Sequence, residues 1–77
     1  MREALKDTPI RKQPDYEGIG EMLRDFRESI GVTLPQAARD LHIKQSYLIA
    51  LEEGKLEVIP GGAYAKGYMK KYAAYLG

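Results

Sequence analysis

Cysteine is absent from the sequence, which excludes a disulfide and a thiolate metal site. The single histidine, His42, has no second histidine or cysteine with which to share a metal ion or activate a nucleophile. The glycines of "GGAYAKG" do not form a dinucleotide fingerprint, because no strand pattern precedes them. We therefore expect a protein that is not an enzyme and that uses no cofactor and no metal ion.

Long hydrophobic runs are also lacking. No apolar run approaches the roughly 20 residues that a membrane-spanning helix needs. The N-terminal stretch "MREALKDTPIRKQPD" has scattered charges and lacks the apolar segment of a signal peptide. A hydrophobic content of 44% is nevertheless enough for a compact core, so 77 residues predict one small domain.

The sequence also lacks an excess of charge of one sign. The chain has 12 lysines and arginines against 11 aspartates and glutamates, a formal net charge of +1. A domain that binds nucleic acid mainly through phosphates usually has a clear basic excess. The charge balance therefore weakens the case for nucleic-acid binding as the main function.

The apolar pattern divides the chain into an arm and a domain. Residues 1–18 contain two prolines, mixed charges and no apolar period, which predicts a flexible N-terminal arm. Residues 19–77 form the predicted domain, and its first helix has one apolar face at spacings of four, three and four: Ile19, Leu23, Phe26 and Ile30. Gly31 suits the end of this helix. The charged side chains between these positions predict a solvated face: Glu21, Arg24, Asp25, Arg27 and Glu28.

Two short helices are predicted next. Thr33 and Gln36 fit a capping box with Pro35 in the first turn, which starts a helix that buries Leu34, Ala37, Ala38 and Leu41. A third helix covers "KQSYLIALEE" at residues 44–53 and ends at Gly54. Its predicted buried side chains are Tyr47, Leu48 and Leu51.

After Gly54 the chain forms a predicted turn region, in which Leu56 and Ile59 point into the core, and a last helix from about Ala63. Pro60, Gly61 and Gly62 separate these two parts. No strand pattern appears, so the predicted fold is an all-α bundle of four to five helices.

Two short helices joined by a tight turn describe a helix-turn-helix unit. The run from Gln36 through Ala38 and Glu52 to Gly54 resembles the helix-turn-helix of the Xre/Cro repressor family, in which a glutamine opens the first helix, an alanine faces the second, and Glu-x-Gly closes it. This resemblance implies a bundle similar to that of the lambda repressor.

In that family the second of these helices enters the major groove of DNA with its first turn. Here that turn would present Lys44, Gln45, Ser46 and Ile49 to the base edges, and a glutamine can read adenine. The helix has no arginine, Lys44 stands where the family often has a serine or threonine cap, and His42 replaces the turn glycine. DNA binding by a transcriptional regulator is therefore the alternative function.

Four of the six tyrosines lie in the last helix, at Tyr64, Tyr68, Tyr72 and Tyr75. At about 100° per residue, the apolar and aromatic arc of this helix is about 180° wide, which exceeds what docking on one core needs. The aliphatic side with Tyr72 is the predicted core half. Tyr64, Tyr68 and Tyr75 either lie flat on the bundle with their hydroxyls in water or form a surface for a protein partner, flanked by lysines.

A closer resemblance covers residues 19–77. The runs "SYLIALEEG" and "YAKGYMKKYAAYLG", with the Pro-Gly turn between them, resemble the cytoplasmic helix-turn-helix domain of the bacterial cell-shape protein RodZ and its relatives. The resemblance implies a non-catalytic adaptor that docks an aromatic pair, here Tyr64 and Tyr68, onto the actin-like filament protein MreB. Lys66 and Lys70 are implied as contacts to an acidic patch.

RodZ proteins continue into a membrane-spanning helix. The resemblance therefore also implies a cytoplasmic domain at the inner membrane, whose membrane attachment runs only through a segment that this chain lacks.

Overall fold

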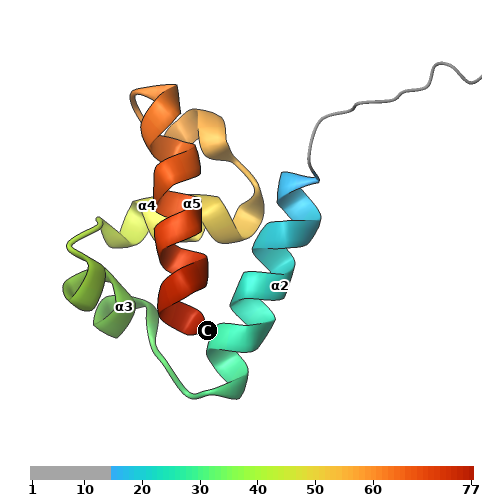
Figure 1. Cartoon of the computed structure of the whole chain (residues 1–77), viewed down its shortest axis with the longest axis vertical. Helices are drawn as coiled ribbons and strands as arrows, with labels where there is room; N and C mark the ends of the chain where they lie inside the picture. Colours follow the sequence, from blue (N-terminus) through green and yellow to red (C-terminus); the bar gives the residue numbers. More distant parts are fainter. Residues whose placement is uncertain (1–14) are drawn as a thin grey trace, which may run out of the picture.

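The computed structural model describes residues 15–77, and most of the predicted arm lies outside them. The described chain forms helices α2 (Tyr16–Ser29), α3 (Leu34–Leu41) and α4 (Gln45–Glu53), a short 3₁₀ helix η1 (Leu56–Val58) and helix α5 (Gly62–Leu76). Residues 15–77 contain no strand, which confirms the all-α fold. In Figure 1, α5 runs through the middle of the bundle with α3 on one side and α2 on the other.

Helix α2 begins three residues earlier than predicted, at Tyr16 instead of Ile19. The reason is a cap that the apolar pattern does not reveal. The side chain of Asp15 accepts a hydrogen bond from the backbone N–H of Gly18 at 3.0 Å, which satisfies one of the free donors of the first turn. The predicted end is confirmed, since Gly31 follows the helix with a positive φ of 76°.

Helices α3 and α4 and the turn between them follow the expected helix-turn-helix layout. Thr33 Oγ1 accepts a hydrogen bond from the backbone N–H of Gln36 at 3.2 Å, which confirms Thr33 as the cap of α3. His42 adopts a left-handed conformation with φ of 57°, the geometry that favours glycine. Lys44 stands at the cap position of α4 but forms no side-chain cap hydrogen bond. Gly54 ends α4 with φ of 73°, as predicted.

The core is formed by helices α2 to α5 and by Ile43 and Ile59, which lie between helices. Its members are mainly aliphatic: Leu23, Ala37, Leu41, Ile43, Leu48, Ala50, Leu51, Ile59, Ala65, Met69, Tyr72 and Leu76. Tyr72 is fully buried, which confirms its predicted place in the core half of the last helix. Ile59 is buried as predicted, while Leu56 is only half-buried.

The inward face of α2 differs from the predicted one. Phe26 and Ile30, predicted to be core residues, are 45% and 49% exposed, whereas Arg27, predicted to be solvated, is 8% exposed. The buried positions are Gly20, Leu23 and Arg27, so the inward face is rotated relative to the apolar stripe. A side chain on Gly20 would overlap the backbone carbonyls of Leu51 and Glu52, which shows how closely α2 approaches α4 at this point.

Within residues 15–77, no helix combines the length and the apolar character that crossing a bilayer requires.

Candidate functional site

Three tyrosine rings form a row across α4 and α5. The Tyr68 ring lies between the other two, with its centroid 6.1 Å from that of Tyr47 and 6.2 Å from that of Tyr64. The interplanar angles are 21° and 19°, so the Tyr68 ring is stacked on both of its neighbours. Tyr64 and Tyr68 are one helical turn apart on α5, and Tyr47 adds a ring from α4. We call these three residues the aromatic row.

The aromatic row is open to solvent at one end and charged at the other. The Tyr64 side of the row is the open end, since this residue is 66% exposed, whereas Tyr68 and Tyr47 are half-buried. At the other end the Lys44 ammonium lies 5.7 Å from the centroid of the Tyr47 ring, within the range of a cation–π interaction. The surface therefore combines stacked aromatic rings with one positive charge.

The sequence did not reveal the part that Tyr47 has in this surface. Its spacing with Leu48 and Leu51 predicted a core residue, and the structure leaves it half-buried against Tyr68. Only a weak sign in the sequence indicated that Tyr47 lies at the edge of the buried face. Tyr47 directly precedes fully buried Leu48, so on the helix it is turned by about 100° from the centre of that face.

Two of the predicted contact residues, Lys66 and Lys70, lie away from the aromatic row. Both line a groove between α5 and α2, together with Tyr16, Ile19, Gly67 and Met69. On the helical wheel of α5 they are turned by about 200° and 240° from Tyr64, whereas Tyr68 is turned by only about 40°. The structure thus brings Tyr64 and Tyr68 together and places the two lysines on the far side of the same helix.

Tyr75 is also separated from the aromatic row. It follows Tyr68 by seven residues, which is about 10 Å along the helix. Its hydroxyl donates a hydrogen bond to Asp40 Oδ2 of α3 at 2.6 Å, and this bond to a carboxylate raises the pKa of Tyr75. Tyr75 therefore joins α5 to α3.

The residues predicted to face DNA gather at the start of α4. Lys44, Gln45 and Ser46 are exposed there, and Ile49 is half-buried one turn further on. The exposed N-terminus of a helix carries a partial positive charge. Lys44 belongs both to this group and to the charged end of the aromatic row, so the two candidate surfaces meet at that residue.

A buried polar network holds α5 in its position on the other helices. The guanidinium of Arg27 donates to both carboxylate oxygens of Glu52, from Nε at 2.7 Å and from Nη2 at 3.2 Å. The Tyr72 hydroxyl donates to Glu52 Oε2 at 2.5 Å, and Arg27 Nη1 donates to the carbonyl of Val32 at 3.0 Å. The network thus links α2, α4 and α5.

The ionisation of this network follows from its geometry. The hydrogen bond to Glu52 raises the pKa of Arg27. Burial, followed by the hydrogen bond to Glu52, raises the pKa of Tyr72. Glu52 and Arg27 thus form a charge-assisted bidentate pair to which Tyr72 adds a neutral donor. Arg27 follows buried Leu23 by four residues, and Glu52 follows buried Leu48 by four residues. This spacing places both charged side chains on the buried faces of their helices, and it was the signal in the sequence that pointed to the pair.

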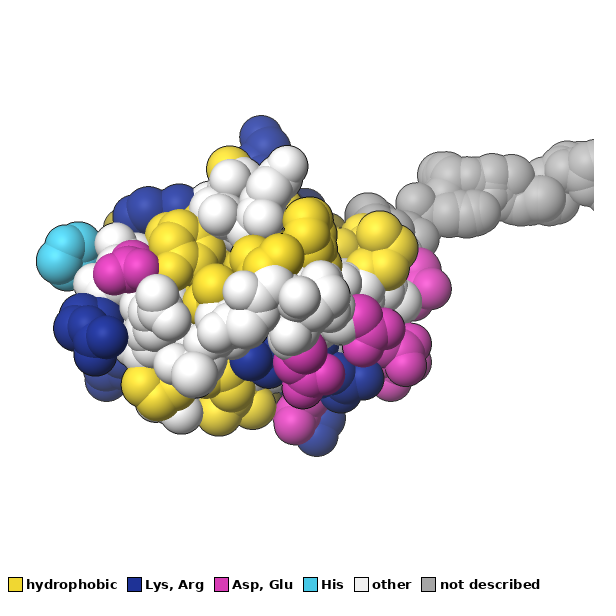
Figure 2. Space-filling view, turned by 90° about the horizontal axis from the view of Figure 1, so that it is seen from below, with side chains coloured by type: hydrophobic (Ala, Val, Ile, Leu, Met, Phe, Trp, Pro, Cys, Tyr) yellow, Lys and Arg dark blue, Asp and Glu magenta, His cyan; other side chains and the backbone are white. Residues whose placement is uncertain are grey.

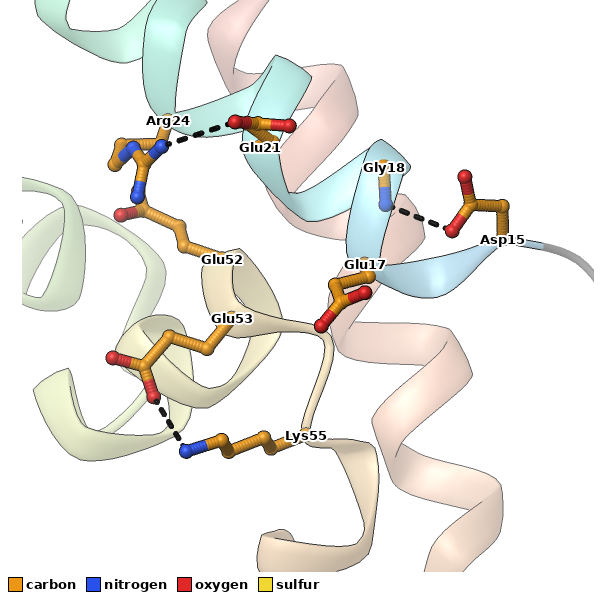
Figure 3. A pocket seen from close by; sticks show the side chains of 8 residues that line it. All are labelled: Asp15, Glu17, Gly18, Glu21, Arg24, Glu52, Glu53 and Lys55. Carbon is orange, nitrogen blue, oxygen red and sulfur yellow. Dashed lines mark hydrogen bonds and ion pairs between the residues drawn. The ribbon is translucent and has the colours of Figure 1, made fainter.

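A depression of about 520 Å³ between α2 and α4 is lined mainly by charged groups: Asp15, Glu17, Gly18, Glu21, Arg24, Glu52, Glu53 and Lys55. Figure 3 shows that the carboxylates of Glu21 and Glu53 turn toward Arg24 and Lys55, at 3.7 Å and 3.6 Å, and do not converge on one point. No group of three or more histidine, aspartate or glutamate side chains in residues 15–77 is arranged to hold a metal ion. We therefore do not assign a site to this depression.

The comparisons with known proteins agree with the geometry of α3 and α4. Residues 22–77 match the family described as "Helix-turn-helix domain". A stretch of 35 residues is 46% identical to part of the "Uncharacterized membrane protein YmfM" of Bacillus subtilis (strain 168). This stretch is 46% of the chain and 12% of that protein, so the chain corresponds to a small part of its relative. No solved structure matches the chain.

Proposed function

The chain belongs to the helix-turn-helix domain family, and from this premise we propose that it is a non-catalytic adaptor domain of the RodZ-like kind, which binds filaments of MreB. The aromatic row is the observation that carries the proposal. Tyrosines are enriched among the residues that anchor protein interfaces. Stacking already limits the motion of Tyr68 and Tyr47, so less conformational entropy is lost when a partner covers them.

The contacts divide into anchors and a charged neighbour. Tyr64 and Tyr68 are the anchors, because they are the exposed end and the centre of the aromatic row. Lys44 and Tyr47 extend the contact onto α4 and favour an acidic partner surface. Lys66, Lys70 and Tyr75 lie outside the aromatic row, so we expect them to contribute less to this interface.

The relative from Bacillus subtilis, named as a membrane protein, supports a membrane context for this kind of domain. We place the domain on the cytoplasmic face of the membrane, attached through a segment outside this chain. In that position the aromatic row would connect the membrane to a filament that runs along it.

Co-sedimentation with polymerised MreB tests the proposal. Tyr64→Ala and Tyr68→Ala should each weaken binding by at least about 1 kcal/mol, roughly fivefold in the dissociation constant. Ile30→Ala is the matched control, because it truncates an exposed apolar side chain directly after α2 and should leave binding unchanged. If the double tyrosine variant sediments with the filament as well as the wild type does, the assignment of the aromatic row is wrong.

DNA binding through α4 is the second candidate, favoured by the exposure of Lys44, Gln45 and Ser46 at the start of that helix. It predicts an affinity that falls steeply with added salt and that Gln45→Ala reduces in a sequence-dependent way. Fluorescence titrations with several short duplexes of different sequence, repeated across salt concentrations, measure both effects. If no binding occurs at low salt, this candidate is refuted.

A further inference from the structure

Helix α5 begins without a side-chain cap. Gly61 occupies the cap position with φ and ψ both at 68°, and it provides no side-chain hydrogen bond to the first turn. Helices more commonly begin at serine, threonine, aspartate or asparagine, whose side chains accept from a free backbone N–H of that turn. The backbone carbonyl of Gly61 accepts a hydrogen bond from the N–H of Tyr64 at 2.6 Å. Helix capping by a side chain therefore does not explain the residue at this position.

The ring of Tyr64 lies against Gly61. A side chain in a helix points back toward the N-terminus, over the residues three and four positions before it. Tyr64 follows Gly61 by three residues, and a Cβ added at Gly61 would lie 2.9 Å from Cδ2 and 3.3 Å from Cε2 of Tyr64. The first distance is well below the roughly 3.5–4.0 Å at which carbon atoms pack. A side chain on residue 61 and this position of the Tyr64 ring therefore exclude each other.

The position of the Tyr64 ring matters for the aromatic row. The ring is stacked on that of Tyr68, one turn further along α5, with 6.2 Å between the centroids. Tyr64 is nevertheless 66% exposed. An exposed side chain with free rotamers loses conformational entropy when a partner covers it, and a side chain that is already ordered loses less. The glycine thus permits an ordered ring at the open end of the row.

The left-handed backbone of Gly61 also favours glycine, and Gly31 separates the two effects. Gly31 has a similar φ of 76°, but a Cβ added there would meet no heavy atom within 4 Å. It follows α2 at the end of the bundle where α2 and α5 both end, far from the first turn of α5 (Figure 1). Figure 2 shows this end, where hydrophobic side chains also reach the surface. The two glycines share the backbone requirement, and of the two Gly61 alone has a ring where its side chain would be.

We propose that Gly61 is a positioning residue of the aromatic row, because its missing Cβ leaves the space that the Tyr64 ring occupies when it stacks on Tyr68. The consequence for a partner rests on the proposed function, in which Tyr64 is the exposed anchor. A side chain on residue 61 displaces this ring from Tyr68, so a partner must order it again on binding and the affinity falls. Gly61 acts through Tyr64 and not through a contact of its own.

Nuclear magnetic resonance of the free 77-residue chain tests the positioning. Nuclear Overhauser effects between the ring protons of Tyr64 and Tyr68, together with the ring-current shifts of both rings, report the stacking. Gly61→Ala should remove these effects. The matched control Gly31→Ala carries the same kind of backbone strain and should keep them.

A second variant covers the case in which alanine loosens the start of α5. Gly61→Asn brings the same Cβ, but asparagine tolerates the left-handed conformation better, so this variant should lose the stacking while the helix stays intact. Circular dichroism spectra and melting curves verify that each variant is folded. Stacking that persists in both Gly61 variants overturns the proposal.

Co-sedimentation with polymerised MreB tests the consequence for binding. Gly61→Ala should raise the dissociation constant at least about threefold, whereas Gly31→Ala should leave it unchanged. In a chain that already carries Tyr64→Ala, Gly61→Ala should have no further effect, because the ring that it displaces is gone. An equal loss in both backgrounds would show that Gly61 does not act through Tyr64, and the proposal would then be wrong. If the wild-type chain does not bind MreB, the proposed function fails, while the ring measurements still decide whether Gly61 positions Tyr64.

Discussion

Replacing Tyr72 by phenylalanine isolates one hydrogen bond of the buried network. The change keeps the ring, which is fully buried, and removes only the hydroxyl that donates to Glu52 Oε2. A hydrogen bond to a charged group contributes about 1.5–3 kcal/mol to stability. Glu52 keeps both hydrogen bonds from Arg27, so we expect a loss at the lower end of this range, about 1.5–2 kcal/mol at pH 7.

The dependence of this loss on pH follows from the raised pKa of Tyr72 in the folded state. An unfolded tyrosine titrates near pH 10. Above that pH the unfolded wild type loses a proton that the folded protein keeps, so the wild type is destabilised by about 1.4 kcal/mol per pH unit. Phenylalanine has no such proton. The stability difference should therefore be constant below about pH 10 and shrink above it.

Urea unfolding of both proteins at pH 7, 9 and 11, followed by circular dichroism, measures the difference. The other tyrosines titrate equally in the two proteins and cancel. Tyr75→Phe is the matched control, because its hydroxyl also donates to a carboxylate but at the surface, and it should cost less. A difference below about 0.5 kcal/mol at pH 7, or one that is unchanged at pH 11, would show that the Tyr72 hydroxyl does not stabilise the fold through Glu52.

Further changes test the packing by the same urea assay. Glu52→Leu alone should cost about 3–5 kcal/mol because it removes the buried carboxylate that pairs with Arg27, and adding Arg27→Met should recover most of that loss. His42→Gly should raise the free energy of unfolding by up to about 1 kcal/mol, since the left-handed conformation no longer strains a side chain; no gain would refute this reasoning. Gly20→Ala should cost about 3 kcal/mol because the new methyl group overlaps the backbone of α4, whereas Gly67→Ala should gain about 1 kcal/mol.

The order of the helices and most of their ends could be predicted from the sequence because these features depend on local chemistry. The Thr33 cap and the left-handed glycine at Gly54 act within a few residues of their own position. The early start of α2 depends on Asp15, which was also a local signal, but the apolar period begins only at Ile19 and concealed it. The burial of Tyr72 followed from the helical wheel of a single helix.

The candidate site could be predicted only in part because it depends on how helices meet. A helical wheel gives directions within one helix, so it correctly set Tyr64 beside Tyr68. It could not show that Tyr47 of another helix completes the row, or that Tyr75 bonds to Asp40. Lys66 and Lys70 line a groove only because α2 lies beside them, and a helical wheel of α5 alone does not include α2.

The predicted inward face of α2 was wrong for a related reason. Apolar residues at Phe26 and Ile30 normally mark a core face, but here the close approach of α2 to α4 at Gly20 fixes the rotation of the helix. That rotation buries Arg27, which pairs with Glu52, and leaves Phe26 at the surface. The rotation of the helix thus exposes apolar side chains that their own pattern predicts to be buried.

The buried network connects this rotation to the aromatic row. Apolar contacts alone would tolerate small rotations of α5, whereas the hydrogen bond from Tyr72 to Glu52 has a preferred direction and joins α5 to α4. Tyr72 follows Tyr68 by one turn, so fixing Tyr72 also fixes the ring that must meet Tyr47 on α4. A surface made from two helices needs such a directional link, and the two hydrogen bonds from Arg27 hold the accepting carboxylate of Glu52 in place.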